Sequence, residues 1–203
     1  MATTRIEDRL DKALADERWP QARALILREL KTDPDNHWLL TQLGVTLYEE
    51  KRYSESLAVF ESSLAIVDDC PLTQWNIGGA LDMLGRPREA IRHYLWILNQ
   101  NSTDDPCWES VEWTASLRAD CLYRLGHCYR QLKQNAKAAR CFRQYLELLY
   151  VGVTGIYTAD DTAKSLALVT VKPSALQFTR RVNDIIHHAT NGKSKASSTL
   201  THA

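Results

Sequence analysis

A glycine preceded by an aliphatic residue recurs along this chain, and its interval constrains the fold more than any other sequence feature. Gly78 follows Gly44 by 34 residues (78 − 44 = 34), and the same local pattern returns around Gly126. A small residue stands twelve places after each glycine and an aromatic one sixteen places after it: Ser56 and Phe60, Ala90 and Tyr94, Ala138 and Phe142. This self-similarity predicts stacked helical hairpins, because each hairpin can bury its apolar face only against a neighbour.

The repeat predicts how the helices of each hairpin meet. The glycine of the first helix leaves room for the second helix, the small residue faces it, and the aromatic residue is expected to fill the space between successive hairpins. One period before Gly44 lies Leu10, which indicates a degenerate first hairpin. The interval from Gly78 to Gly126 is 48 residues, or 34 + 14, so an insertion is expected at about residues 99–118. Asp105-Pro106 predicts a helix start there, with Trp108 and Trp113 covering the insertion or forming a contact surface.

The fourth hairpin carries the fullest motif, with Leu125-Gly126, Tyr129, Ala138 and Phe142. This pattern resembles the tetratricopeptide repeat, and the resemblance extends over about residues 3–148. It implies an all-α fold: a right-handed superhelical stack of about four hairpins, the first degenerate, with a C-terminal capping helix. The family's first-position tryptophan is missing from every unit, and its closing proline is kept only as Pro34.

We therefore expect three segments. Residues 1–150 form the helical repeat domain, residues 151–190 a loop and a capping helix, and residues 191–203 a disordered tail rich in Gly, Ser, Lys and Thr. The capping box Ser174-x-x-Gln177 places the predicted capping helix at about residues 175–189.

Composition excludes several classes of function. Lys+Arg and Asp+Glu are both 25, so no net field attracts nucleic acid or an anionic membrane. No stretch is apolar enough for a membrane span, and the first ten residues lack the core of a secretory signal. The odd number of cysteines, 5, favours reduced thiols in a cytoplasm. We expect a cytoplasmic protein with no nucleic-acid or membrane partner.

Catalytic motifs are missing from the sequence. It has no G-x-S-x-G, P-loop or H-E-x-x-H motif, and its cysteines lack the close pairing typical of metal ligands. Cys121, His127 and Cys128 are the residues that a thiol-dependent or metal-dependent enzyme would use. Packing as small apolar residues is the better interpretation of the cysteines. We therefore predict no enzyme activity, no cofactor and no metal site.

The resemblance implies that the first helix of each hairpin lines a concave groove. The partner-binding positions it implies are Trp38, Thr41 and Tyr48 in the second hairpin, Trp75, Asn76, Gly79 and Asp82 in the third, and Tyr123, Arg124, His127 and Arg130 in the fourth. Aromatic residues mixed with Asn and Arg are typical of recognition surfaces. The alternative is that Trp38 and Trp75 are packing residues displaced from their usual places.

One known use of such a groove does not fit this chain. Relatives that clamp the C-terminal carboxylates of heat-shock chaperones use Lys and Asn residues where this chain has Thr41 and Val45, and Asp120 replaces another Lys. Only Asn76 and Arg124 match the clamp, and Asn76 is expected to bond the backbone of an extended peptide instead.

The leading hypothesis is a non-catalytic adaptor or scaffold that binds a peptide or helix of a partner protein. A chaperone for secreted proteins is the related alternative, and the thiol-dependent or metal-dependent enzyme is the one from another class. Self-association through the groove or the segment carrying Trp108 and Trp113 would give a homo-oligomer.

Overall fold

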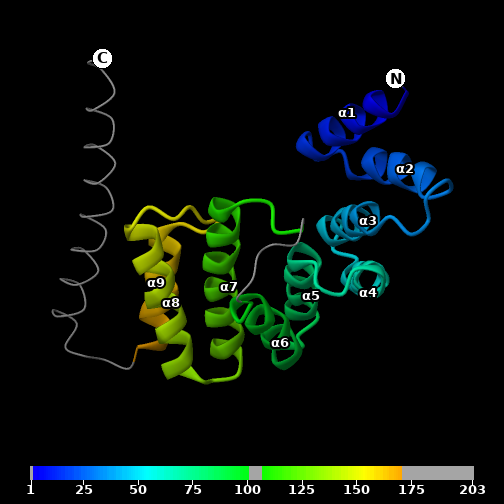
Figure 1. Cartoon of the computed structure of the whole chain (residues 1–203). Helices are drawn as coiled ribbons and strands as arrows, with labels where there is room; N and C mark the ends of the chain where they lie inside the picture. Colours follow the sequence, from blue (N-terminus) through cyan, green and yellow to red (C-terminus); the bar gives the residue numbers. More distant parts are fainter. Residues whose placement is uncertain (1, 101–106, 171–203) are drawn as a thin grey trace, which may run out of the picture. The chain divides into compact units, whose positions relative to one another are not determined.

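The structure is a computed structural model that describes residues 2–100 and 107–170. Every regular element in those ranges is an α-helix (Figure 1). In chain order the helices are α1 Ala2–Ala15, α2 Trp19–Glu29, α3 His37–Glu49, α4 Tyr53–Ile66, α5 Pro71–Met83, α6 Pro87–Leu98, α7 Val111–Gln131, α8 Asn135–Tyr150 and α9 Ala159–Val169. The predicted all-α fold is confirmed. The predicted capping helix at 175–189 and tail at 191–203 lie outside the described residues.

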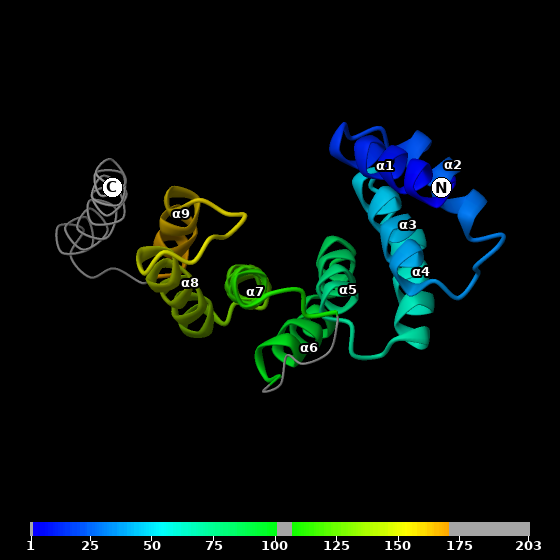
Figure 2. The same cartoon turned by 45° about the horizontal axis from the view of Figure 1, so that its top comes forward.

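The chain divides into two compact units, which are described separately. The N-terminal unit, Met1–Cys107, contains α1 to α6, and the C-terminal unit, Trp108–Ala203, contains α7 to α9. Consecutive helices pair as hairpins in the N-terminal unit: α1 with α2, α3 with α4 and α5 with α6 (Figure 2). In the C-terminal unit α7 pairs with α8, and α9 packs mainly on α8.

The repeated glycine lies directly against the aromatic ring of its own hairpin. A Cβ atom on Gly126 would lie 2.5 Å from Cε1 of Phe142, and one on Gly78 would lie 2.6 Å from Cε1 of Tyr94. Gly44 faces Phe60 in the same way. The ring of the aromatic residue thus occupies the volume that the glycine leaves empty within its own hairpin. In the last hairpin, Phe142 also packs with side chains of α9, the next helix in the chain.

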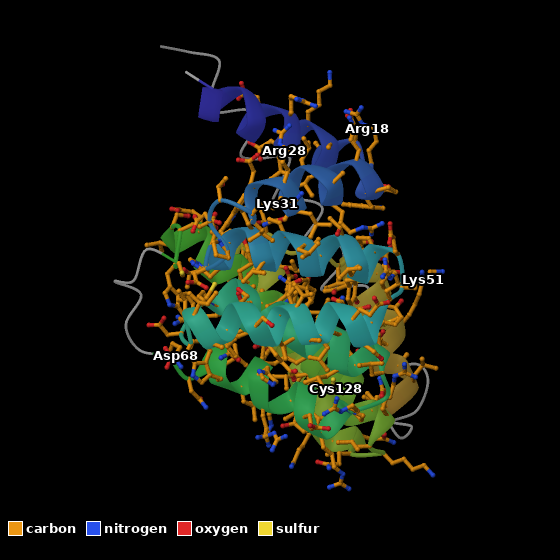
Figure 3. All side chains as sticks on the ribbon, turned by 90° about the vertical axis from the view of Figure 1, so that its right-hand side faces the viewer. Arg18, Arg28, Lys31, Lys51, Asp68 and Cys128 are labelled. Atoms are coloured by element: carbon orange, nitrogen blue, oxygen red, sulfur yellow. The ribbon has the colours of Figure 1, made fainter. Side chains whose placement is uncertain are left out.

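Backbone geometry extends the repeat to the first hairpin. The turn between the two helices of each hairpin contains a residue in the left-handed region: Glu17 at φ 54°, Lys51 at φ 62°, Gly85 at φ 71° and Lys133 at φ 59°. Each follows Leu10, Gly44, Gly78 or Gly126 by seven places. Lys51, labelled in Figure 3, lies in the turn between α3 and α4. The turn conformation is thus kept even where the motif has diverged, although only Gly85 is free of the steric cost of this region.

Helix ends explain one wrong prediction. The helix predicted to start at Asp105-Pro106 begins instead at Val111, because the Ser110 hydroxyl caps it by accepting the Trp113 N–H at 3.1 Å. With 21 residues, α7 is longer than α3 and α5, which have 13 each. Trp108 is buried before α7, and the Arg118 guanidinium lies 5.5 Å from its ring centroid. Trp108 is therefore a packing residue and does not project as a contact surface.

Each unit has its own apolar core. In the N-terminal unit, side chains of α1, α2 and α3 form a buried cluster that includes Leu10, Ile26 and Leu43. In the C-terminal unit Phe142 and Leu146 of α8 pack with Leu166 and Val169 of α9. Hence α9 covers the apolar face of the last hairpin. Among the described residues, none of the helices is both long and apolar enough to span a bilayer.

Candidate partner-binding surface

The predicted positions on α3 divide into exposed and buried residues. Trp38 is 41% exposed, and Tyr48 is half-buried with its ring edge-on to Tyr53 at a centroid distance of 5.2 Å. Thr41 is only 1% exposed, which corrects its prediction as an exposed groove residue. Its hydroxyl lies 2.8 Å from the hydroxyls of both Ser63 and Thr73, so this side chain joins α3, α4 and α5.

On α5 the predicted residues are more enclosed. Asn76 is buried, and its amide Nδ2 donates to the Leu72 carbonyl at 2.9 Å, within its own helix. Gly79 is also buried, with the Tyr48 ring near it, so the two helices are close at this point. Trp75 and Asp82 are half-buried and remain partly accessible to solvent. Trp38, Tyr48, Trp75 and Asp82 are therefore the accessible predicted residues of the N-terminal unit, and they are called the α3–α5 surface below.

The predicted positions on α7 contact another part of the same chain. After α8, residues 151–158, named the return segment, pass across α7. The Tyr157 ring stacks on Tyr123 with a centroid distance of 3.7 Å and an interplanar angle of 9°. The Arg124 guanidinium lies 5.4 Å from the Tyr157 ring centroid, and His127 Nε2 lies 3.4 Å from the Ser165 hydroxyl of α9. Of the four residues predicted on α7, only Arg130 is exposed.

Backbone hydrogen bonds hold the return segment. The buried Asp120 carboxylate accepts the Ile156 N–H at 2.9 Å. The Tyr145 hydroxyl donates to the Tyr157 carbonyl at 2.7 Å and accepts the Tyr157 N–H at 3.1 Å. A side chain at Gly155 would collide with Tyr145, which explains the glycine at this point. These side chains on the hairpin α7–α8 therefore bind main-chain groups of a passing segment.

Burial strongly affects the ionisation of Asp120. Loss of hydration raises the pKa of this carboxyl to about 6, although the Ile156 N–H and the charge of Arg124 partly oppose the shift. The residue that the sequence marked as unfavourable for a carboxylate ligand is thus an acceptor for a backbone N–H. That N–H belongs to Ile156 of the same chain, not to a separate ligand.

The sequence suggested a loop with one short helix after Tyr150, as is found, but it did not predict the bounds of α9 or the contacts of the return segment. A signal was present: Thr158-x-x-Asp161 has the spacing of a helix cap, and the Thr158 hydroxyl accepts the Asp161 N–H at 3.1 Å. Nothing in the repeat period indicated that Tyr157 would stack on Tyr123. That contact depends on the path of an irregular segment.

The cysteines differ in their surroundings. All five lie in the described ranges, and none is in a disulfide. Burial raises the pKa of Cys121 well above its usual value and that of Cys141 to about 11, which disfavours the reactive thiolate. Within residues 2–100 and 107–170, the side chains close enough to share a metal ion are His37, Cys70 and Cys107, not Cys121, His127 and Cys128.

Similarity to known proteins agrees with this geometry. Residues 119–148, which span most of the hairpin α7–α8, match the sequence profile described as "Tetratricopeptide repeat". The chain is thus a helical-repeat protein with a tetratricopeptide-type fold, as its motif predicted. No curated protein matches it significantly in sequence.

Solved structures named MamA have a similar fold. One, titled "Crystal structure of MamA protein", is 16% identical, with a TM-score of 0.62 over 99% of this chain and 96% of the other. "MamA RS-1 ArsTM double mutant" is 13% identical, with a TM-score of 0.67 and 96% of each chain covered. A MamA fragment from Desulfovibrio magneticus RS-1 is 12% identical, with a TM-score of 0.67 and 95% of each chain covered. At these identities the likeness shows the fold alone.

Proposed function

We propose that this chain is a non-catalytic adaptor that binds an extended segment of a partner protein on the α3–α5 surface. Protein binding is the role that the tetratricopeptide-type fold supports. One observation carries the finer proposal: the hairpin α7–α8 already holds an irregular segment, the return segment, through positions that the groove prediction had singled out. Asp120 accepts its backbone N–H, and Tyr123 stacks on its aromatic side chain.

The repeat frame relates these contacts to the α3–α5 surface. Tyr123 stands three residues before Gly126, and Trp75 stands three residues before Gly78. Trp75 is half-buried, and the accessible part of its indole ring can add apolar contact area with a partner. Trp38 adds an exposed ring, and Asp82 adds a carboxylate that can accept N–H groups. We therefore propose an extended partner segment that carries an aromatic side chain.

Three of the residues predicted on α7 could bind a partner only if other parts of the chain moved away from them. Tyr123, Arg124 and His127 contact the return segment or α9, so a partner would reach them only by displacing these elements. We also propose a reducing compartment such as the cytoplasm, because the odd number of cysteines, 5, favours reduced thiols.

Affinity capture with the full chain tests the proposal. Trp75→Ala should lower retention of the partner identified with the wild type by about thirtyfold, because truncating an aromatic anchor commonly costs about 2 kcal/mol. Leu27→Ala is the matched control, since Leu27 is 48% exposed but lies on α2. Equal retention by both variants, with unchanged helicity, would exclude the α3–α5 surface. Capture of only the chain itself would indicate a homo-oligomer.

A further inference from the structure

We propose that the N-terminal unit binds one Zn²⁺ ion through His37, Cys70 and Cys107. Their ligand atoms all lie within 4.8 Å of one another, and Nε2 of His37 is 3.6 Å from Sγ of Cys107. Cys70 is buried, whereas His37 and Cys107 are half-buried, so the cluster lies near the surface where an ion can enter. This inference is independent of the proposed partner binding.

The spacing of the three atoms suits a tetrahedral zinc site. With Zn–S near 2.3 Å and Zn–N near 2.0–2.1 Å, two ligands of one tetrahedral ion lie about 3.6 Å apart for N···S and about 3.8 Å apart for S···S. The His37–Cys107 distance of 3.6 Å already has this value. The other pairs, bounded at 4.8 Å, need only small side-chain adjustments. Three protein ligands leave the fourth position for water.

The chemistry of the ligands favours zinc over harder cations. Thiolate sulfur and imidazole nitrogen are preferred by zinc, whereas magnesium and calcium prefer oxygen ligands. Two thiolates also balance the two charges of Zn²⁺, so a site with neutral imidazole has no net charge to bury. Without a metal, the 3.6 Å between His37 and Cys107 corresponds to a contact between a thiol and an imidazole. Metal titration distinguishes a metal site from such a contact.

The backbone at His37 and at Cys70 is well held. The Asn36 side chain caps α3 by accepting the Leu39 N–H at 3.0 Å. The His37 carbonyl accepts the Thr41 hydroxyl at 2.9 Å and the Ser63 hydroxyl at 2.7 Å. Cys70 is the N-cap residue of α5 and precedes Pro71, which restricts its backbone to extended conformations. Such fixed positions reduce the ordering cost of metal binding.

Ligands far apart in the sequence meet in this cluster. Cys70 follows His37 by 33 residues (70 − 37 = 33), close to the period of 34, whereas Cys107 follows Cys70 by 37 (107 − 70 = 37) and lies in the predicted insertion, outside the repeat pattern. His37 begins α3, and Cys70 directly precedes α5. A bound ion would therefore connect the start of α3, the start of α5 and Cys107, and it would stabilise the N-terminal unit.

Metal titration of the full chain under reducing conditions tests the site. After metal removal, the wild type should bind one Zn²⁺ per chain, and Co²⁺ should give the charge-transfer and visible bands of a tetrahedral thiolate site. Cys107→Ser and His37→Gln should each weaken Zn²⁺ binding by at least about a hundredfold. Zn²⁺ should raise the Tm of the wild type and have little effect on these variants. Cys141→Ser, which changes a buried thiol of α8, should bind like the wild type.

Two results would overturn the inference. One is equal Zn²⁺ affinity in the wild type and in folded Cys107→Ser and His37→Gln. The other is loss of binding in Cys128→Ser with no loss in Cys107→Ser, which would place the metal on α7. Circular dichroism of each variant without metal ensures that weaker binding is not a consequence of unfolding.

Discussion

The two units present first helices of the same repeat in different states. In the C-terminal unit, Tyr123 of α7 is stacked against Tyr157 of the return segment. In the N-terminal unit, the α3–α5 surface keeps Trp38 exposed and Trp75 half-buried. A position in the repeat therefore does not fix its role. In the C-terminal unit, the path of the neighbouring chain packs the aromatic residue at this position internally. For Trp75, binding of a partner is the proposal.

The comparison of the two units assumes that their hairpins are built alike. Substitution of the repeated glycine tests this assumption with the largest expected effect. Gly126→Leu should destabilise the C-terminal unit by about 3 kcal/mol or more, because even a Cβ atom there would lie 2.5 Å from the Phe142 ring. Gly78→Leu should have a similar effect on the N-terminal unit. Chemical denaturation followed by circular dichroism measures both.

Gly79→Ala is the matched control for these variants. A Cβ at Gly79 would meet Tyr48 at 3.7 Å, an ordinary contact, so alanine should be neutral or slightly stabilising in this helix. If Gly78→Leu and Gly79→Ala had equal effects, the assigned glycine–aromatic contact would be wrong.

Asp120 should make the stability of the C-terminal unit depend on pH. Its pKa rises from 3.8 to about 6 on folding, so the folded state holds the proton more tightly than the unfolded state. The stabilisation is complete below about pH 4 and is lost as pH rises through 6, a change of up to about 3 kcal/mol. Asp120→Asn should remove this change.

Comparing wild type with Asp120→Asn at each pH cancels the contributions of other carboxyl groups. One of these is Asp161, whose pKa is lowered by the Thr158 hydroxyl and by Lys164 and which therefore acts in the opposite direction. The difference in unfolding free energy should favour Asp120→Asn more strongly at pH 7 than at pH 4. A difference independent of pH would contradict the buried environment of Asp120.

The return segment should detach when its acceptor is removed. Asp120→Ala leaves the Ile156 N–H without its bond of 2.9 Å and should cost about 1 to 3 kcal/mol. Hydrogen exchange at the Ile156 and Tyr157 amides should accelerate, whereas Asp120→Asn, which keeps an acceptor oxygen, should protect them. Unchanged exchange in Asp120→Ala would show that the Tyr145 hydroxyl and the stacking on Tyr123 hold the segment without Asp120.

Substitutions in the turns of the hairpins should change stability least. Gly85→Lys should destabilise by about 1 kcal/mol, because a side chain disfavours the left-handed backbone at φ 71°. Lys51→Gly, at the equivalent turn with φ 62°, should be neutral or stabilising by a few tenths of a kcal/mol. Thermal melts of the two variants should shift in opposite directions or differ clearly in size. Equal shifts would contradict the shared turn geometry.

Sequence patterns predicted the features that repeat. The positions of Gly44, Gly78 and Gly126 and their aromatic partners follow from steric demands that every hairpin shares, so periodicity reveals them. Thr41 could not be assigned in this way. Its burial depends on hydroxyl partners on two other helices, Ser63 and Thr73, and therefore on packing between hairpins.

Two features of the candidate sites were beyond the repeat pattern. The return segment is irregular, so no period reports that Asp120 would bind its backbone. The cluster of His37, Cys70 and Cys107 was overlooked because metal ligands were sought at close spacing, whereas these residues lie 33 and 37 positions apart in the sequence. The prediction of no metal site rested on that search. A search at the repeat interval would still have missed Cys107, because it lies in the predicted insertion, outside the repeat frame.

Photo-crosslinking tests most directly whether the α3–α5 surface is the one available to a partner. A benzophenone amino acid would replace Trp75 in one variant and Tyr123 in another, and both would be irradiated with the partner identified by affinity capture. The account predicts intermolecular crosslinks from position 75, and from position 123 only crosslinks to residues 151–158 of the same chain. Intermolecular crosslinks from position 123, with none from position 75, would contradict it.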